Sequence, residues 1–322
     1  MIARFSADLA GVWPEGAHPA TRLGLAVSGG PDSLALLLLA HAALPGRIEA
    51  ATVDHGLRAA SADEAAMVAQ VCAGLGVPHA VLAVEVGAGN LQSEARDARY
   101  AALAGWLAER GLAALATAHH ADDQAETLLA RLNRASGVAG LAGVRPRGVI
   151  PGSDGLVLRP VLGWRRSELA DVVAAAGLAA ADDPSNRDPR FDRVRLREAL
   201  AGADWLDPVA LAASAAHLAD ADAALEWAAR REFRESVSRD GPALTYRPRA
   251  PRAIALRVLA MIVHEMDDAA PRGGALARLF DALVARETAS IGNLVVRPLP
   301  GGWSFTAAPR RRAPMLPAKK LP

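Results

Sequence analysis

The chain has 322 residues, of which 52% are hydrophobic, and its 36 Lys and Arg nearly balance its 35 Asp and Glu. This length allows two domains with buried cores. The lack of an apolar run of about 18 residues argues against a membrane span, and Met1–Ala10 lacks the core of a signal peptide. A single cysteine, Cys72, excludes an internal disulfide and a multi-cysteine metal site. These features predict a cytoplasmic protein with no membrane partner.

The near-zero net charge hides a difference between the two parts of the chain. Residues 1–200 hold 19 Arg against 22 Asp and Glu, a net charge of −3, whereas residues 201–322 hold 17 Lys and Arg against 13 Asp and Glu, net +4. A basic excess favours a nucleic-acid partner, and a solvated basic tail is the alternative. The two lysines, Lys319 and Lys320, both lie at the C-terminus.

The first predicted strand, Leu23–Val27, runs directly into a glycine-rich loop and a helix. The loop consists of Ser28, Gly29, Gly30, Pro31, Asp32 and Ser33. Glycines let a ligand approach the backbone closely, Pro31 suits the first helical turn, and the N–H groups of a helix start attract anions. The loop therefore predicts a phosphate or pyrophosphate pocket. The alternative is an ordinary turn with Asp32 or Ser33 as the helix cap.

This loop differs from a Walker loop, because Asp32 and Ser33 stand where Lys and Ser or Thr are required. An acidic side chain facing phosphates implies a divalent cation between them, and Mg²⁺ fits best. The string Ser-Gly-Gly-x-Asp-Ser resembles the pyrophosphate loop of the ATP pyrophosphatase (PP-loop) superfamily. Members of that superfamily cleave ATP to AMP and pyrophosphate while they adenylate a substrate.

Strands and helices alternate through the rest of the first 160 residues. The further predicted strands are Arg47–Val53, His79–Val84, Leu112–Ala118 and Leu156–Arg159, and the predicted helices are Ser61 to about Ala73, opened by a Ser61-x-x-Glu64 capping box, and Leu91–Arg110, ended by Gly111. This alternation predicts an α/β fold with a doubly wound, mostly parallel sheet. Ligands of such sheets bind at the carboxyl ends of the strands, so we expect the motifs that follow these ends to converge on one site.

Two of these motifs contain candidate nucleotide ligands. Asp54 and His55 follow the second strand, where an acidic residue of a dinucleotide fold binds a ribose hydroxyl, although both are also ordinary turn residues. On the long helix, Arg96 and Arg99 share one face and are able to bind phosphate bidentately. The alternative for the two arginines is salt bridges within the helix.

A denser motif follows the strand that ends at Ala118. It contains His119, His120, Asp122, Asp123, Gln124 and Glu126. Three interpretations remain open: a capping box formed by Asp123-x-x-Glu126, a metal site built from the histidines and aspartates, and an acidic pocket for a cation such as an amine substrate. Capping alone does not explain two histidines beside two carboxylates, so we predict a functional role.

The last motif of the first part, Asp182–Arg197, is rich in turn residues and charge. Its Arg193, Arg195 and Arg197 predict a track for nucleic-acid phosphates. A solvated linker is the alternative.

From about Asp207 the pattern becomes helical. The predicted elements are helices at Pro208–Arg239, Arg252–Met266 and Gly274–Arg286, followed by a hairpin of Leu294–Arg297 and Trp303–Phe305. Whether the first of these helices is interrupted by a break stays open. We predict a catalytic domain at residues 1–205, a smaller, mainly helical domain with a terminal hairpin at 206–308, and a basic, disordered tail at 309–322.

Together the segments from Leu23 to about Leu200 resemble the tRNA(Ile)-lysidine synthetase family of the PP-loop superfamily. The matching motifs are Ser-Gly-Gly-Pro-Asp-Ser, Asp-His-Gly-Leu-Arg (54–58), Asn-x-x-x-Glu-Ala-Arg-x-Ala-Arg-Tyr (90–100), Ala-His-His-Ala-Asp-Asp-Gln-Ala-Glu-Thr (118–127) and Asp-Asp-Pro-Ser-Asn (182–186). One departure is Val194, where the family often has Asn. The resemblance implies an adenine-nucleotide alpha-hydrolase-like fold.

The resemblance also implies a reaction. The family uses ATP to join L-lysine to C2 of the wobble cytidine, C34, of isoleucine tRNA with a CAU anticodon, through an adenylated cytidine, and it releases AMP and pyrophosphate. ATP and Mg²⁺ would be required, and residues 206–308 would bind tRNA. The oligomeric state stays open between a monomer and a homodimer.

Roles carry over to matching positions as the resemblance implies them. ATP would lie on Val27, the loop from Ser28 to Ser33, and Asp54, with Mg²⁺ on Asp32 and Asp123. The ammonium groups of lysine would be bound by Asp123 and Glu126, and phosphate charge would be offset by Arg96, with Arg99 as a second candidate. The amine would be oriented or deprotonated by His119 or His120, and tRNA would contact Arg193, Arg195 and Arg197.

Three other functions remain as alternatives. A tRNA-thiolating enzyme of the superfamily uses paired cysteines or an iron–sulfur cluster, which a lone Cys72 disfavours. An amidotransferase-type synthetase for a small metabolite would leave the arginine-rich segments unexplained. A nucleotide-binding module without catalysis would not need Asp32 together with the histidine pair and its carboxylates.

Overall fold

The structure is a computed structural model that describes residues 1–56, 60–84, 91–181, 192–269, 271 and 273–309. The predicted motif residues 182–186 and Arg58 and the predicted tail from residue 310 lie outside the described residues. The chain divides into two compact units at Ala219/Asp220, within the helix α9 (Pro208–Ser236). No helix of the described ranges is both long and apolar enough to cross a membrane.

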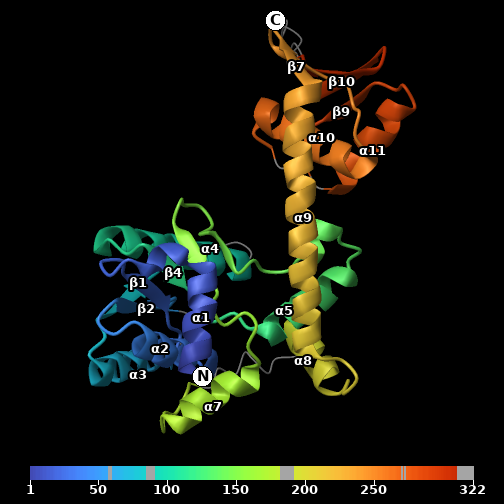
Figure 1. The fold of residues 1–322 in the computed structure, drawn as a ribbon. Helices are drawn as coiled ribbons and strands as arrows, with labels where there is room; N and C mark the ends of the chain where they lie inside the picture. The colour runs from blue at the N-terminus through green and yellow to red at the C-terminus, as the bar shows by residue number, and fades with distance from the viewer. Residues whose placement is uncertain (57–59, 85–90, 182–191, 270, 272, 310–322) are drawn as a thin grey trace, which may run out of the picture. The chain divides into compact units, whose positions relative to one another are not determined.

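The first unit is built on a six-stranded sheet (Figure 1). In spatial order its strands are β3 (His79–Ala83), β2 (Ile48–Asp54), β1 (Leu23–Ala26), β4 (Ala114–Ala116), β6 (Leu156–Leu158) and β5 (Arg147–Val149). Neighbouring strands are parallel except for β5, which pairs antiparallel with β6. The predicted mostly parallel α/β fold is confirmed. The edge strand β5 was not predicted, because its sequence Arg-Gly-Val contains no apolar run, unlike the equally short β4 and β6.

Helices cover both faces of this sheet. In β4 the side chains of Ala114 and Ala116 belong to one hydrophobic core and that of Leu115 to the other, as the alternation of a strand requires. The first core is covered by α1 (Ile2–Val12), α2 (Pro31–Ala43), α3 (Ala60–Leu75) and α7 (Arg166–Ala175), and the second by α4 (Leu91–Arg110). The helix α4 has the predicted bounds, and Gly111 ends it with φ +62°.

The strand order places the ligand-binding edge. The chain moves outward from β1 through β2 to β3 and then crosses back to β4 on the other side of β1. The loops after β1 and β4 therefore separate at their carboxyl ends, and a crevice forms there. The remaining elements of the unit are η1 (Pro14–Ala17), α5 (Ala121–Leu132), α6 (Val138–Leu141) and α8 (Asp192–Ala201).

The second unit combines an antiparallel sheet with two helices. Its strands follow the order β7 (Val237–Asp240), β8 (Ala243–Tyr246), β11 (Gly302–Ala307), β10 (Leu294–Leu299) and β9 (Ala289–Ile291), and α10 (Arg252–Asp267) and α11 (Gly273–Val284) pack on it. The predicted hairpin is confirmed as β10 and β11, whose strands pair from Leu294↔Ala307 to Leu299↔Gly302.

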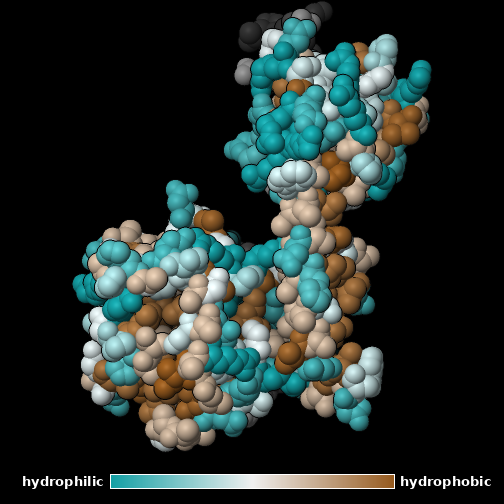
Figure 2. Space-filling view, in the orientation of Figure 1, coloured by the Kyte–Doolittle hydropathy of each residue, from teal (hydrophilic) through white to brown (hydrophobic). Residues whose placement is uncertain are grey.

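The prediction of a helix reaching Arg239 was wrong. The helix α9 ends at Ser236, and Val237 pairs with Tyr246 in the sheet. Trp303 lies on β11, the middle strand of this sheet. Its ring packs edge-on against the rings of Tyr246 and Phe280, with ring centroids 5.6 Å apart in both pairs. The face of this unit visible in Figure 2 is predominantly hydrophilic, so its apolar side chains are gathered inside.

Candidate active site

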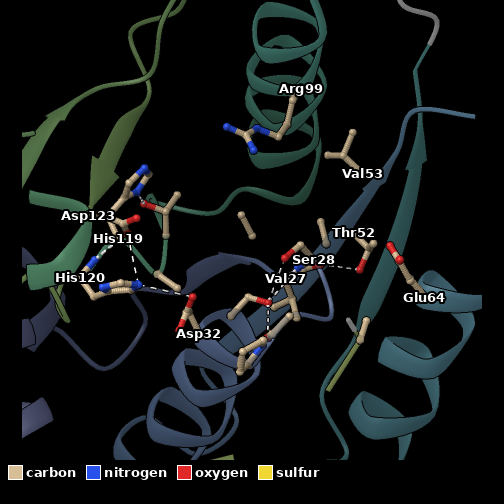
Figure 3. Close-up of a pocket in the computed structure, with 18 of the residues that line it drawn as sticks. Val27, Ser28, Asp32, Thr52, Val53, Glu64, Arg99, His119, His120 and Asp123 are labelled. Carbon is tan, nitrogen blue, oxygen red and sulfur yellow. Dashed lines mark hydrogen bonds and ion pairs between the residues drawn. The ribbon is translucent and has the colours of Figure 1, made fainter. Parts of the chain in front are cut away.

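A cavity of ≈ 590 Å³ opens at the carboxyl ends of β1, β2 and β4 (Figure 3). It is lined by eleven of the predicted site residues, namely Val27, Ser28, Gly30, Pro31, Asp32, Ser33, His119, His120, Asp123, Arg193 and Arg197. The predicted site residues outside its lining are Gly29, Asp54, Arg96, Glu126 and Arg195. The loop after β1 and the motif after β4 meet at this cavity because both follow the carboxyl ends of neighbouring parallel strands. One face of α8 completes the lining.

The loop after β1 is held in shape by a serine hydroxyl. The backbone N–H of Ser28 donates to Oγ of Ser33 at 3.1 Å, and that hydroxyl donates to the carbonyl of Gly30 at 3.0 Å. Gly29 adopts φ +89°, which L side chains rarely reach, and its carbonyl accepts from the N–H of Ala181 at 2.9 Å. The loop thus forms a fixed cradle.

The cradle ends at the N-terminus of α2. Gly30 is the N-cap, with an ordinary φ of −71°, and Pro31 follows at the first helical position. No side chain caps this end, so the alternative in which Asp32 or Ser33 is the cap was wrong. Uncapped N–H groups that face a cavity attract an anion.

Asp32 stands in the first turn of α2 and faces the motif after β4. Its Oδ2 lies 3.4 Å from Nε2 of His120, while its Oδ1 is buried without a hydrogen-bond partner. A buried carboxylate oxygen normally has a partner. The unpartnered Oδ1 is therefore suited to accept a cation or a hydrogen-bond donor of a ligand.

His120 is surrounded by three carboxylates. Its Nε2 lies 3.5 Å from Oδ2 of Asp123, and its Nδ1 lies 3.6 Å from Oδ2 of Asp122. Burial alone would lower the pKa of this imidazole, but Asp122, Asp32 and Asp123 outweigh it and raise the pKa to about 10. The side chain is therefore an imidazolium that holds the carboxylates together.

His119 has the opposite character. Burial, with Arg159, Arg193 and Arg99 nearby, lowers its pKa to about 4, although Asp123 opposes the shift. Its Nδ1 lies 2.9 Å from Oγ1 of Thr117. His119 is thus a neutral imidazole at pH 7 that lines the cavity and is able to accept a proton.

Asp122 and Asp123, which follow the two histidines, accept hydrogen bonds from different parts of the backbone. Asp123 occupies the third position of α5, and its Oδ2 accepts from the backbone N–H of His120 at 3.1 Å. The alternative of an Asp123-x-x-Glu126 capping box was wrong, because the N-cap is His120, three residues before Asp123. Asp122 accepts from the N–H of Arg166 at 2.8 Å, so it anchors α7.

Glu126 lies one turn beyond Asp123 and is buried, with 2% exposure. Its Oε1 accepts from Nε of Arg197 at 2.8 Å, and its Oε2 is buried without a hydrogen-bond partner. Arg197 itself lines the cavity. The pair therefore joins α5 to α8 and presents the arginine to the cavity, with the carboxylate behind it.

The arginines of α8 fall on two faces. Arg193 and Arg197 are one turn apart and line the cavity, whereas Arg195 is rotated away by about 200°. Val194 is buried, with 6% exposure. The departure from the family pattern at this position therefore adds an apolar side chain to the interior.

The side of the cavity next to α4 and β2 contains residues that the sequence motifs only partly indicated. Arg99 reaches over the cavity from α4, and its guanidinium lies 5.2 Å from the ring of Tyr100 (Figure 3). Arg96 stacks on the same ring at 5.3 Å without lining the cavity. Glu64 on α3 lines the cavity and was missed, because a capping-box role already explained its spacing.

The end of β2 contributes His55 to the cavity. Asp54, its neighbour, accepts from the N–H of Gly56 at 2.9 Å and from the hydroxyl of Ser61 at 2.6 Å. The contacts with Ser61 and Gly56 hold the pKa of Asp54 below its usual value. Asp54 thus shapes the loop after β2, and His55 faces the cavity.

The carboxylates of Asp32 and Asp123 are of a kind that would suit a magnesium ion. Oδ2 of Asp32 and Oδ2 of Asp123 approach the same atom, Nε2 of His120, and Oδ1 of Asp32 lacks a partner. Mg²⁺ commonly takes one or two carboxylates and completes its shell with water and substrate phosphates. Within the described part of the chain, no group of three or more His, Cys, Asp or Glu is arranged to hold a metal by itself. The alternative of a histidine-based metal site therefore has no support.

Known proteins resemble this chain along most of its length. A family model described as a PP-loop domain matches residues 3–203. A tRNA(Ile)-lysidine synthase from Novosphingobium aromaticivorans is 46% identical over 318 residues, which cover 98% of this chain and 96% of that protein. One from Zymomonas mobilis is 40% identical over 303 residues, with 92% and 91% covered. The solved U34-tRNA thiolase NcsA from Methanococcus maripaludis shares the fold, with a TM-score of 0.54 at 16% identity over 67% of this chain and 77% of that one.

Proposed function

The chain belongs to the tRNA(Ile)-lysidine synthase family of PP-loop proteins, and we infer that it joins L-lysine to C2 of the wobble cytidine of isoleucine tRNA with a CAU anticodon. It is an ATP-dependent ligase that forms a C–N bond and produces lysidine, AMP and pyrophosphate. The observation that carries this inference is the cavity itself, where an uncapped helix start lies beside the unpartnered Oδ1 of Asp32. Such a site suits the phosphates of ATP and a cation.

The first step transfers AMP to the cytidine. O2 of the base attacks the α-phosphorus of ATP, the new O–P bond forms, and pyrophosphate leaves with the electrons of the broken P–O bond. The loop from Ser28 to Ser33 holds the departing pyrophosphate on its backbone N–H groups. Arg99 and Arg193, which both line the cavity, offset the charge that develops on the phosphate.

Asp32 and Asp123 are the residues that hold Mg²⁺ in this proposal. The ion, when bound, supplies positive charge that neutralises the phosphates and favours pyrophosphate as a leaving group. The buried Oδ1 of Asp32, which has no hydrogen-bond partner, and the presence of both aspartates in the cavity lining support this assignment. His120 then keeps the two carboxylates in place from the protein side.

The second step brings in the lysine. Its ε-amine attacks C2 of the adenylated cytidine, the C–N bond forms, and AMP leaves with O2 as the C–O bond breaks. The nitrogen must lose a proton, and His119, which lines the cavity and is neutral at pH 7, orients the amine or takes up that proton. Asp123 supplies negative charge for the ammonium groups of lysine from the cavity lining. Glu126, which lies behind the lining and pairs with Arg197, adds negative charge at longer range.

The RNA reaches this cavity as an unstacked base. Arg193, Arg195 and Arg197 on α8, together with the basic residues of 206–308, are the proposed contacts to the tRNA. The net charge of +4 over residues 201–322 supports this role.

The chain does not fit thiolation by paired cysteines. Cys72 is the single cysteine, it is buried with 0% exposure, and burial raises the pKa of its thiol to about 11. A thiol of this kind is inert, because the thiolate is the reactive form.

The test is the ATP-dependent incorporation of radiolabelled lysine into an isoleucine tRNA transcript with a CAU anticodon. We expect label in the RNA when ATP and Mg²⁺ are present and none when either is left out. Release of AMP without label in the RNA would contradict the proposal and indicate an adenylating enzyme for a different acceptor.

A further inference from the structure

A second, smaller cavity of ≈ 250 Å³ lies between α5 and α8. It is lined by Ala130, Asn133, Arg134, Arg195 and Leu196. The first three residues belong to the last turn of α5 and the turn after it, and the other two belong to α8. No residue of this cavity lines the reaction cavity, so the two are separate features of the same unit.

The helix α8 forms a wall of both cavities. It presents Arg193 and Arg197 to the reaction cavity and Arg195 to the second one. Side chains two residues apart in a helix point in nearly opposite directions, about 200° apart. The two cavities therefore lie on opposite flanks of a helix about 10 Å wide, a width that a few nucleotides of an RNA strand can span.

The lining of the second cavity suits a phosphodiester. One guanidinium group comes from the turn after α5 and the other from α8, and guanidinium groups bind phosphate oxygens through paired N–H donors. Asn133 adds an amide, which commonly contacts phosphate and sugar oxygens. Ala130 and Leu196 add an apolar floor, against which the carbon face of a ribose is able to pack.

We propose that this second cavity binds a backbone phosphate of the substrate RNA a few nucleotides from the reacting cytidine. Arg134 and Arg195 hold the phosphate, and α8 lies between it and the base in the reaction cavity. The inference rests on the proposed function, because it requires an RNA substrate. It gives the three proposed tRNA contacts of α8 different places: Arg193 and Arg197 face the reacting nucleotide in the reaction cavity, and Arg195 faces a backbone phosphate in the second cavity.

A free nucleotide is a poorer occupant of this cavity. A nucleotide site needs donors and acceptors for the base as well as for the phosphate, and apart from the two arginines the lining offers one amide. A polymer needs only the phosphate contact here, because its base is recognised elsewhere.

The experiment measures steady-state kinetics of lysine incorporation with Arg134→Gln, Arg195→Gln and the double variant. We expect KM for the tRNA to rise roughly tenfold for each single change, as a charge-assisted contact is lost. KM for ATP, KM for lysine and kcat at saturating tRNA should stay within about twofold of the unmodified protein. Arg134→Lys and Arg195→Lys, which keep the charge, should recover part of the affinity.

Salt dependence identifies the contact as a phosphate contact. A plot of log KM for the tRNA against log salt concentration should lose about 0.7 in slope for each phosphate contact removed from a single strand. Arg22→Gln is the matched control, since it removes the same charge at the amino end of β1, on the opposite edge of the sheet. There Arg110 still pairs with Glu49 at 2.8 Å. This control should keep the original KM and slope.

Each outcome decides the proposal. An unchanged KM and salt slope in the double variant, with lysine incorporation intact, overturns the second cavity as an RNA site and leaves the proposed function standing. A rise in KM for ATP in place of KM for the tRNA also overturns it and indicates a site for a free nucleotide. Failure of the unmodified protein to label any RNA refutes the proposed function itself.

Discussion

The amino ends and the carboxyl ends of the strands in the first sheet differ in how their buried carboxylates are paired. We call these two sides of the sheet the amino edge and the carboxyl edge. At the amino edge, Glu49 has 2% exposure and is paired with both Arg22 and Arg110, the latter through contacts of 2.8 and 3.1 Å. At the carboxyl edge, Asp32 and two further aspartates share the single imidazolium of His120. Asp122 also has Nε of Arg165 at 3.7 Å. Two cations therefore serve three carboxylates at the carboxyl edge, whereas two cations serve one carboxylate at the amino edge.

This difference separates a stabilising contact from a binding site. A fully paired carboxylate gains nothing from a ligand, so the amino edge serves the fold. The unpartnered Oδ1 of Asp32 and the crowding of like charges raise the free energy of the carboxyl edge. A cation or phosphate-bound metal relieves both, and the same residues then act in the reaction.

The largest effect is expected from Asp32→Asn. It should lower the rate of lysine incorporation about 10²- to 10³-fold, because charge at the metal and phosphate position is lost. The melting temperature should change little, since Asp122 and Asp123 still contact His120 in the variant. Lysine incorporation and thermal unfolding measure the two effects.

Asp122→Asn is the matched control for that variant. Asp122 also contacts His120, at 3.6 Å, but it is absent from the cavity lining and accepts from the N–H of Arg166. An amide oxygen keeps that hydrogen bond, so the rate should fall less than about tenfold. Equal losses for Asp32→Asn and Asp122→Asn would contradict the special role given to Asp32.

The amino edge should show the reverse pattern. Glu49→Gln removes the charge that two arginines share, and we expect the free energy of unfolding to fall by about 1–3 kcal/mol. Activity per folded molecule should not change, because Glu49 lies at the far end of its strand from the cavity. Urea unfolding and lysine incorporation together test this. A loss of activity without a loss of stability would refute the division between the edges.

A smaller effect concerns the pH dependence of stability. The pKa of His119 is about 4 in the folded chain and near 6.5 when unfolded. Its contribution is therefore fully present above pH 6.5 and is lost as the pH falls toward 4. His119→Gln lacks this component, so its unfolding free energy should fall less steeply between pH 6.5 and 4.5 in urea titrations. Parallel curves for the two proteins would show that His119 titrates normally.

The smallest effect is expected at Cys72. Burial and a pKa of about 11 leave its thiol unreactive at pH 8. An alkylating reagent should label the folded protein negligibly and label it stoichiometrically in denaturant, as mass spectrometry reports. Rapid labelling of the folded protein would place Cys72 at the surface and reopen the thiolation alternative.

Local sequence signals were sufficient for the loop after β1 and for α4. Gly29 takes the positive φ, Pro31 opens α2, and Gly111 ends α4, because these residue types restrict the backbone wherever they occur. The four strands that were not predicted, β5, β7, β8 and β9, are three or four residues long. Pairing with distant partners determines such strands, and no local pattern carries that information.

Side-chain partners across helices were also beyond the sequence. The spacing of Asp123 and Glu126 correctly places them one turn apart, but it does not show that Arg197 pairs with Glu126 from α8. In the same way, the spacing of three arginines does not show which of them face the reaction cavity. Only the packing of α8 on α5 assigns Arg193 and Arg197 to one cavity and Arg195 to the other.

The most direct test of the account is the stoichiometry of one reaction. AMP formed and lysine bound to RNA are measured together with the CAU transcript and with a transcript that has uridine in place of cytidine 34. The account predicts equal amounts of AMP and RNA-bound lysine with the first transcript and neither product with the second. AMP formation that does not depend on cytidine 34 would contradict the assignment of the carboxyl edge to this reaction.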